Sequence, residues 1–283
     1  MTSWRCRERE LPIGERTLVM GIVNVTPDSF SDGGMFSDAD AAVKHGLRLL
    51  EEGADLLDVG GESTRPGSEA VTSDEERRRV LPVMEGLRRE APEALLSVDT
   101  RKAEVARDAV AAGADVVNDI GAGTDPELFG AVAGSGAGLV LMHMKGEPKT
   151  MQEDPRYDDV VGEVRSFLAE RLREAVGAGI GPDRLCADPG IGFGKNLQHN
   201  LELLRAIGTF RDLGVPVLAG VSRKRFVGEL SGAADPADRV EGTLGAVAWC
   251  ASRGIEIVRV HDVAPAVRLL AVVDAIARGH RGR

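Results

Sequence analysis

The sequence is poor in cysteine: Cys6, Cys186 and Cys250 are the only three in 283 residues, and they lie far apart. An odd number of cysteines without a C-x-x-C spacing predicts neither a disulfide framework nor a zinc site, and it is typical of a reducing cytoplasm. Long apolar runs are also missing, because no stretch approaches ~18 uninterrupted apolar residues, and the first ten residues are rich in charge. We therefore expect a cytoplasmic protein without a signal peptide or a membrane span.

The chain also lacks an excess of basic residues, since 35 Lys and Arg stand against 45 Asp and Glu, a formal charge of −10 at pH 7. Nucleic-acid binders draw most of their affinity from basic side chains that neutralise phosphates. We therefore expect no nucleic-acid partner. The composition, 43% hydrophobic and 28% charged, is that of a globular chain and argues against disorder.

What the sequence does contain is a repeated alternation of two kinds of segment. Eight short apolar runs alternate with segments whose apolar residues recur at helical spacing, such as residues 73–90 and 196–214. Strands that alternate with helices pair in parallel, and eight such units in roughly 250 residues favour a single (β/α)₈ barrel over an open doubly wound sheet. We expect one domain over residues 18–283, with residues 1–17 as an extension across the bottom of the barrel. The predicted strands are Leu18–Val25, Asp55–Gly61, Leu95–Thr100, Val116–Ile120, Gly138–Met144, Leu185–Pro189, Pro216–Ser222 and Ile255–Asp262.

Polar residues follow all eight predicted strands. In a barrel of this kind the active site is built at the carboxyl ends of the strands, so these residues are the candidates for chemistry. A single polar residue at a strand end needs no function, because it can simply bond its neighbours. The full set is less easily explained in that way: Asn24, Glu62 to Arg65, Asp99, Asn118, His143, Asp188, Ser222 with Lys224, and Arg259 with His261.

Four of these residues, Arg65, Lys224, Arg259 and His261, predict a cationic rim at the mouth of the barrel. Arg259 and His261 are two positions apart, so both project to the same side while the strand stays extended. The alternative is a set of surface salt bridges, each worth ~0–1 kcal/mol. We favour an anion site, because three of these cations adjoin apolar strand residues.

Asp99, Asn118 and Asp188 form a complementary set. Two carboxylates and an amide can accept and donate several hydrogen bonds to a flat, nitrogen-rich heterocycle. A hydrolase with paired carboxylates is the competing interpretation, although a glycoside substrate has no need of the neighbouring anion site.

Three glycine-bearing loops complete the candidate site, at Thr26–Gly34, Gly61–Ser68 and Gly190–Gly194. The first two lack the phosphate-binding patterns G-x-x-x-x-G-K-[ST] and G-x-G-x-x-G. Phe30 and Phe193 lie on such loops in a chain with only seven phenylalanines, and an exposed loop is a costly place for an aromatic ring that binds nothing.

The motifs taken together resemble the dihydropteroate synthase family, in order from about residue 18 to residue 278. They are MGIVNVTPDSFSDGG, DVGGESTRPGS, SVDTRKAEVA, VNDI, LMHMKGEPKTMQ, DPGIGFGKNLQHNLELLR, GVSRKRFVGEL and RVHDV. The resemblance implies a (β/α)₈ barrel that forms homodimers and is a target of sulfonamides. It also implies that the chain joins 6-hydroxymethyl-7,8-dihydropterin pyrophosphate to para-aminobenzoate, releasing pyrophosphate with Mg²⁺.

The resemblance further implies roles for individual residues. The pterin would be held and lined by Asp99, Asn118, Asp188, Lys224, Met142, Phe193 and Gly220. Pyrophosphate and Mg²⁺ would be held by Asn24, Thr64, Arg65, Arg259 and His261, with Asn24 as the protein ligand to the metal. The aminobenzoate pocket would be shaped by Phe30, Thr64, Pro66, Phe193 and Lys224. Among these, Asp99 would stabilise a pterin cation, while Lys224, Arg259 and His261 oppose the charge on the leaving group.

Two alternatives stay open. Another pterin-binding barrel, such as a corrinoid methyltransferase, would share the Asp and Asn contacts, and a non-catalytic relative could bind a pterin without turning it over. The chain also departs from the family at Arg225, where many members carry a small hydroxyl residue after the equivalent of Lys224. Arg225 could contact the aminobenzoate carboxylate or lie in solvent.

Overall fold

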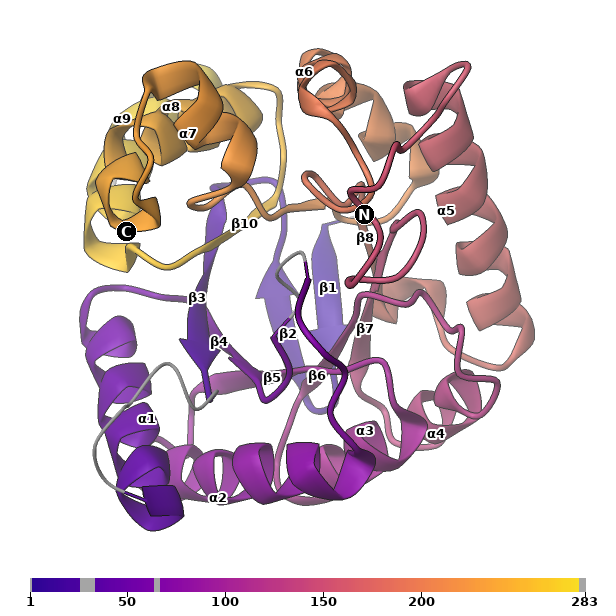
Figure 1. The fold of residues 1–283 in the computed structure, drawn as a ribbon. Helices are drawn as coiled ribbons and strands as arrows, with labels where there is room; N and C mark the ends of the chain where they lie inside the picture. The colour runs from indigo at the N-terminus through magenta and orange to yellow at the C-terminus, as the bar shows by residue number, and fades with distance from the viewer. Residues whose placement is uncertain (1, 26–33, 64–66, 280–283) are drawn as a thin grey trace.

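A ring of helices surrounds a central set of parallel strands in the computed structural model of this chain (Figure 1). The structure describes residues 2–25, 34–63 and 67–279, and for residues 34–37 the backbone alone. Candidate residues Phe30, Thr64, Arg65 and Pro66 lie outside the described residues.

Eight parallel strands form the barrel wall, in the order β8-β7-β6-β5-β4-β3-β10-β9. A bridge between Ala187 and Val217 joins the two ends of this order, and the Ala187 N–H donates to Pro216 O at 2.9 Å. The predicted (β/α)₈ barrel is confirmed. Its strands are β3 (Leu18–Asn24), β4 (Leu56–Gly60), β5 (Leu95–Asp99), β6 (Val116–Asp119), β7 (Gly138–Met142), β8 (Leu185–Asp188), β9 (Leu218–Ala219) and β10 (Ile257–Val260).

Helices follow the strands around the outside of the barrel (Figure 1). The helical segment predicted over residues 196–214 is divided into α6 and a 3₁₀ segment, Ile207–Leu213, and two helices separate β9 from β10. None of the described helices is both long and apolar enough to cross a membrane. The helices are α1 (Gly34–Glu51), α2 (Ser73–Glu90), α3 (Ala103–Ala111), α4 (Leu128–Ala133), α5 (Val160–Gly177), α6 (Leu197–Arg205), α7 (Arg225–Ser231), α8 (Val240–Ser252) and α9 (Val263–Arg278).

An antiparallel hairpin, β1 (Ser3–Cys6) and β2 (Arg9–Pro12), packs on the amino-terminal ends of the barrel strands. Trp4 is fully buried there, and its indole N–H donates to Arg184 O at 2.9 Å. The hairpin residues join one apolar cluster with the inward-facing residues of the barrel. We call the barrel residues of this cluster the lower interior layer: Leu18, Met20, Leu56, Leu95, Val116, Val140, Cys186, Leu218 and Ile257.

A second interior layer lies above the first because side chains alternate along a strand. Residues two or four positions after a residue of the lower layer on the same strand face the same interior. The intervening residues, such as Leu57 and Val258, join the core under the helices. This upper interior layer is mostly polar. It contains Asp58, Ser97, Asp99, Asn118, Met142, Asp188, Gly220 and Arg259.

Candidate active site

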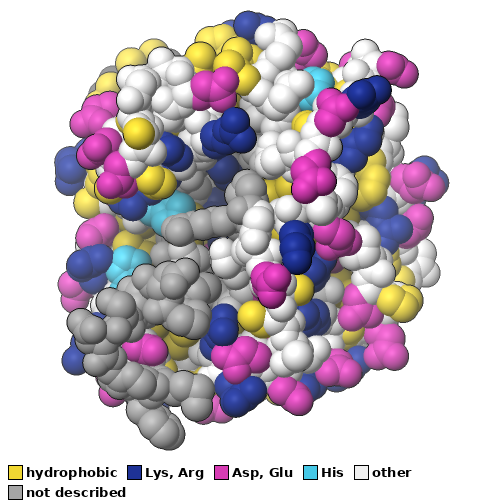
Figure 2. Space-filling model, viewed as in Figure 1, with side chains coloured by type: hydrophobic (Ala, Val, Ile, Leu, Met, Phe, Trp, Pro, Cys, Tyr) yellow, Lys and Arg dark blue, Asp and Glu magenta, His cyan; other side chains and the backbone are white. Residues whose placement is uncertain are grey.

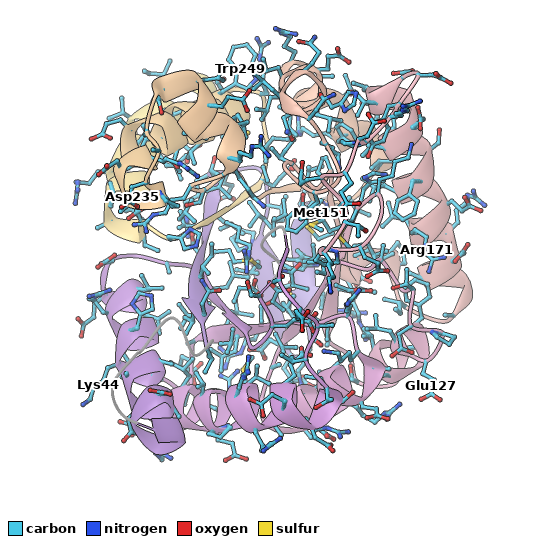
Figure 3. All side chains as sticks on the ribbon, in the orientation of Figure 1. Lys44, Glu127, Met151, Arg171, Asp235 and Trp249 are labelled. Carbon is cyan, nitrogen blue, oxygen red and sulfur yellow. The ribbon has the colours of Figure 1, made fainter. Side chains whose placement is uncertain are left out.

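The upper interior layer forms the floor of a cavity of about 790 Å³ at the carboxyl ends of the strands. This volume lies within the usual range for small-molecule sites, ~300–1,000 Å³. In Figure 3 Met151, which lines the cavity, lies near the middle of the ring of helices. Ten of the predicted site residues line the cavity together: Asn24, Asp99, Asn118, Met142, Asp188, Phe193, Gly220, Lys224, Arg259 and His261.

Arg259 is tied to two carboxylates at the bottom of this cavity. Its Nε donates to Asp58 at 2.6 Å and one of its Nη atoms donates to Asp99 at 2.9 Å. Asp58 is fully buried and accepts two further bonds, from Asn118 Nδ2 at 2.9 Å and from Ser97 Oγ at 2.6 Å. Asp58 therefore fixes both Arg259 and Asn118, and it is a site residue that the sequence analysis did not identify.

Burial changes the protonation of this floor. Desolvation raises the pKa of Asp99 to about 7, although the charge of Arg259 opposes the shift, and the charge of Asp58 adds to it. Burial also works against the charged form of Arg259, but Asp58 and Asp99 outweigh it and raise the pKa of the guanidinium. Arg259 therefore stays charged, and it is held between Asp58 and Asp99.

Asp188 lies at the end of β8, where its Oδ1 accepts the Gly190 N–H at 2.7 Å. Its Oδ2 faces Gly220, at which an added Cβ would lie 3.9 Å from that oxygen. Asp188 and Gly220 both line the cavity. Burial raises the pKa of Asp188 to about 6, against the opposing effects of the Gly190 N–H and Lys224.

Lys224 and Phe193 come from different loops and meet in the cavity wall. The Lys224 Nζ lies 3.8 Å from the centroid of the Phe193 ring, a cation–π geometry. Burial, and next the charge of Arg259, lower the pKa of Lys224 to about 8. Arg223, which precedes Lys224, is a non-glycine residue with a φ of 55°. Its Nε and one of its Nη atoms donate to the Asp262 carboxylate at 3.0 and 2.6 Å.

His261 is paired with Ser222 and is neutral. Ser222 Oγ lies 2.9 Å from His261 Nδ1 and accepts the His261 backbone N–H at 3.1 Å. Burial, followed by the charge of Arg259, lowers the pKa of His261 to about 3. The low pKa of His261 argues against its expected positive charge in a cationic rim at neutral pH, and Arg259 lies in the floor beside Asp58 and Asp99.

A family model described as a pterin binding enzyme matches residues 20–261. The dihydropteroate synthase of Escherichia coli (strain K12) is 46% identical over 257 residues, which cover 91% of this chain and 90% of that relative. The chain belongs to the dihydropteroate synthase family.

Solved structures of this family superpose closely on the chain. A Xanthomonas albilineans dihydropteroate synthase with 4-aminobenzoic acid is 52% identical, with 98% of each chain covered and a TM-score of 0.92. A structure of that enzyme in complex with 7,8-dihydropteroate is 50% identical, covers 98% of this chain and 99% of that chain, and has a TM-score of 0.88.

The sequence analysis did not predict Lys102 or Lys195, because both act on the site through other residues. Lys102 Nζ bonds both Glu62, which lines the cavity, and Glu76, which is buried on α2. Lys195 is also buried, beneath the Gly190–Gly194 loop. Lys195 is the lysine of GFGK and was visible in the sequence. Nothing in that pattern indicates the direction in which its side chain points.

Arg225 lies at the start of α7, is exposed and lines the same cavity. Its exposed position at the start of α7 agrees with the interpretation that Arg225 lies in solvent, and its place at the cavity border also agrees with a contact to the aminobenzoate carboxylate.

Proposed function

We propose that the chain makes 7,8-dihydropteroate from 6-hydroxymethyl-7,8-dihydropterin pyrophosphate and para-aminobenzoate, and that the upper interior layer holds the pterin. The observation that carries this proposal is the convergence of Asp99, Asn118 and Asp188 on one cavity. Met142 and Phe193 add apolar surface in the same cavity, which suits the faces of a flat ring.

Asp188 and Asn118 recognise the edge of the pterin in this proposal. Asp188 Oδ2 accepts from the 2-amino and N3–H donors, and each charge-assisted bond contributes about 1.5–3 kcal/mol. The amide of Asn118 is oriented by its bond to Asp58 at 2.9 Å, so its oxygen is the group left to face the ligand. Lys224 supplies a donor for acceptor atoms on the other side of the ring.

The reaction breaks the C–O bond to pyrophosphate and forms a C–N bond to the aryl amine. The bonding pair leaves with pyrophosphate, the amine lone pair attacks the methylene carbon, and the amine loses a proton. Asp99 offsets the positive charge that develops on the pterin, while Lys224 and the remaining Nη of Arg259 offset the negative charge on the leaving oxygens. His261 contributes as a neutral donor through Nε2, in the tautomer in which Nδ1 accepts from the Ser222 hydroxyl.

The donor set fits Mg²⁺ bound mainly through the substrate. Among the described residues there is no group of three or more His, Cys, Asp or Glu side chains that could hold a metal ion. Mg²⁺ in phosphate-transfer sites takes one or two protein oxygens and completes its shell with phosphates and water. Asn24 lines the cavity and would be that protein ligand, and the bound ion would neutralise charge on the pyrophosphate.

Para-aminobenzoate would bind beside Phe193 and Lys224, with Arg225 at the border of the pocket. Phe30, Thr64 and Pro66, the other residues proposed for this pocket, lie outside the described residues. Arg225 provides a cation for the carboxylate end of the acceptor.

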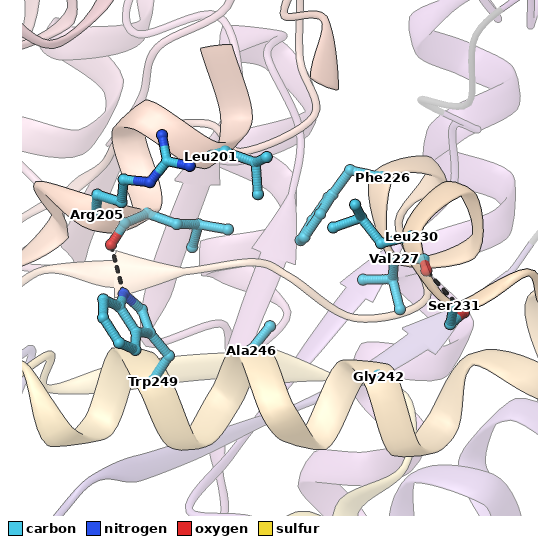
Figure 4. A pocket seen from close by; sticks show the side chains of 10 residues that line it. Leu201, Arg205, Phe226, Val227, Leu230, Ser231, Gly242, Ala246 and Trp249 are labelled. Atoms are coloured by element: carbon cyan, nitrogen blue, oxygen red, sulfur yellow. Dashed lines mark hydrogen bonds between the residues drawn. The ribbon is translucent and has the colours of Figure 1, made fainter. Parts of the chain in front are cut away.

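A homodimer is the second part of the proposal, and an apolar groove of about 370 Å³ between α6, α7 and α8 supports it (Figure 4). Leu201, Phe226 and Ala246 line the groove, and Trp249 borders it with its N–H bonded to Leu204 O at 2.6 Å. Leu230 and Trp249 are 58% and 39% exposed, which is unusual for side chains of this size and is explained if a second copy covers them. Leu230→Glu should then yield a monomer in sedimentation analysis, whereas Val272→Glu on the exposed face of α9 serves as the control.

We also assign the chain to the cytoplasm, which the three free, buried cysteines support. No nucleic-acid partner is expected. On the face drawn in Figure 2, Lys and Arg alternate with Asp and Glu among the described side chains, without a continuous basic surface.

The direct test is pyrophosphate release from the purified protein. Release should require dihydropterin pyrophosphate, para-aminobenzoate and Mg²⁺ together, and dihydropteroate should form in equal amount. Pterin binding without release would instead identify a non-catalytic relative. Methyl transfer from a methylated pterin would identify the corrinoid methyltransferase alternative.

A further inference from the structure

Lys195 is a lysine that the reaction does not use directly, yet it is almost completely buried, with 2% of its surface exposed. Its Nζ donates to Gly190 O at 2.9 Å and to Phe193 O at 2.8 Å, and it lies 3.0 Å from His143 Nδ1. Burial, and then the charge of Lys195, lower the pKa of His143 to about 3, and burial lowers the pKa of Lys195 to about 7, so a neutral His143 ring accepts from Lys195 Nζ. Buried lysines are rare unless every donor is satisfied, and here all three donors have acceptors.

The bonds from Lys195 and close backbone contacts together fix the conformation of the Gly190–Gly194 loop. Gly190 and Gly194 have φ angles of 67° and 61°, and a Cβ at either would lie 1.9 Å from His143 O or 2.2 Å from Lys145 O. The loop backbone is therefore pressed against the chain that follows β7. Two further side chains bond its carbonyls from that segment, Gln152 to Gly192 O at 2.8 Å and Tyr157 to Gly194 O at 2.9 Å.

The same loop carries Phe193 into the cavity, where its ring lies against Lys224 Nζ. Lys195 Nζ donates to the Phe193 carbonyl, whereas the Phe193 ring lines the cavity that would hold the substrates. A change at Lys195 would leave the partly buried Phe193 carbonyl without this donor, whereas Gly190 O would keep the Phe193 N–H at 3.0 Å. An unsatisfied buried group costs about 1–3 kcal/mol, so the loop would move to satisfy the Phe193 carbonyl.

We propose that Lys195 is a positioning residue, which fixes the loop so that Phe193 forms a rigid platform for Lys224 and for the aryl ring of the acceptor. This inference rests on the proposed function. Phe193 also borders the face of the pterin, but the polar contacts of the pterin edge come from Asp188 and Asn118, so loss of the platform should affect the acceptor more than the pterin.

Lys195→Met is the test variant, and Lys44→Met on the exposed surface of α1 is the matched control. The KM for para-aminobenzoate should rise about tenfold in Lys195→Met, the equivalent of about 1.4 kcal/mol, while hydroxymethylpterin affinity by calorimetry changes less than about threefold. Equal losses for both ligands, or no loss for either, would overturn the proposal. Because wild-type turnover and pterin binding are measured alongside, failure of the proposed function would show in the wild type and stay distinguishable.

A double variant tests whether Lys195 acts through Phe193. Phe193→Leu alone should reproduce the rise in KM for para-aminobenzoate, and Lys195→Met with Phe193→Leu should be no worse than the more severe single variant. Additive effects would show that Lys195 acts by another route. If Lys195→Met does not fold, Tyr157→Phe removes the bond to Gly194 O while keeping the ring, and it should raise the same KM about two- to fivefold. An unchanged KM in folded Tyr157→Phe would count against the loop as a positioned platform.

Discussion

The lower and upper interior layers of the barrel are built by the same strands at alternating positions, yet they differ in almost every property. Leu56 in the lower layer is covered by the hairpin, and Asp58, two residues later, accepts three hydrogen bonds from side chains. The lower layer buries apolar surface without any ligand. The upper layer concentrates carboxylates that burial makes costly to ionise, which is a feature of binding sites more than of stabilising cores. The comparison indicates that stability and recognition reside at opposite ends of one set of strands.

The largest effect should come from the hairpin residue Trp4, which packs in one apolar cluster with the lower layer. Trp4→Ala removes a fully buried indole and its bond to Arg184 O, and it should reduce the free energy of unfolding by about 3–5 kcal/mol in urea titrations. Turnover per folded molecule without denaturant should equal that of the wild type. A lower kcat in the folded variant would contradict the separation of the two layers.

Asp188→Asn should have the next largest effect, on binding. The amide keeps an oxygen for the Gly190 N–H but presents a donor to the donor edge of the pterin, so pterin affinity should fall roughly 10- to 100-fold by calorimetry. Asp154→Asn, an exposed carboxylate paired with Arg156, is the control and should bind as the wild type does. Unchanged affinity in Asp188→Asn would remove Asp188 from the pterin site.

His261→Ala tests the leaving-group end of the cavity without disturbing the bonds of Arg259. Loss of a neutral donor should lower kcat/KM with pterin pyrophosphate about tenfold, while affinity for hydroxymethylpterin stays within about twofold. Ser222→Ala, which removes the partner of His261 Nδ1, should act in the same direction with a smaller effect. Equal losses for both ligands would place His261 in the pterin site.

The smallest effect concerns pH. Burial raises the pKa of Asp188 to about 6 in the free protein, and the pterin donors require the ionised carboxylate. The contribution of Asp188 to pterin affinity should therefore be constant above pH 6. Below pH 6 the affinity should fall by up to about tenfold per pH unit. Asp188→Asn should lack this step in calorimetric titrations at pH 5–8. A step that persists in Asp188→Asn would assign the titration to another group.

The strands could be predicted because each is a short apolar run between helical segments, and the polar residue at each end marked the site. β9 is shorter than the predicted strand Pro216–Ser222, because Pro216 has no N–H for the sheet and the Ser222 hydroxyl bonds His261. The bond to His261 could not be predicted from the sequence. The charge state of His261 depends first on burial, which the motif RVHDV does not encode, and then on the charge of Arg259 in the same motif.

The supporting residues were the hardest to predict. Asp58 lies in the apolar run LLDVGG, where a carboxylate would be expected to end the strand, and its three partners come from β5, β6 and β10. The alternation from Leu56 to Asp58 was the available signal. The hairpin β1–β2 was expected only as an extension, because residues 3–12 contain too few alternating apolar positions to predict two strands.

One comparison tests the separation of the two layers most directly: urea unfolding of the wild type, Trp4→Ala and Asp188→Asn, each with and without hydroxymethylpterin. At a pterin concentration 100 times Kd, the wild type should gain about 2.7 kcal/mol of stability. We predict the same gain in Trp4→Ala from a much lower baseline. In Asp188→Asn, with its roughly 10- to 100-fold weaker binding, we predict a gain of only about 0.4–1.4 kcal/mol from a baseline near that of the wild type. A full pterin-dependent gain in Asp188→Asn, or its loss in Trp4→Ala, would contradict the account.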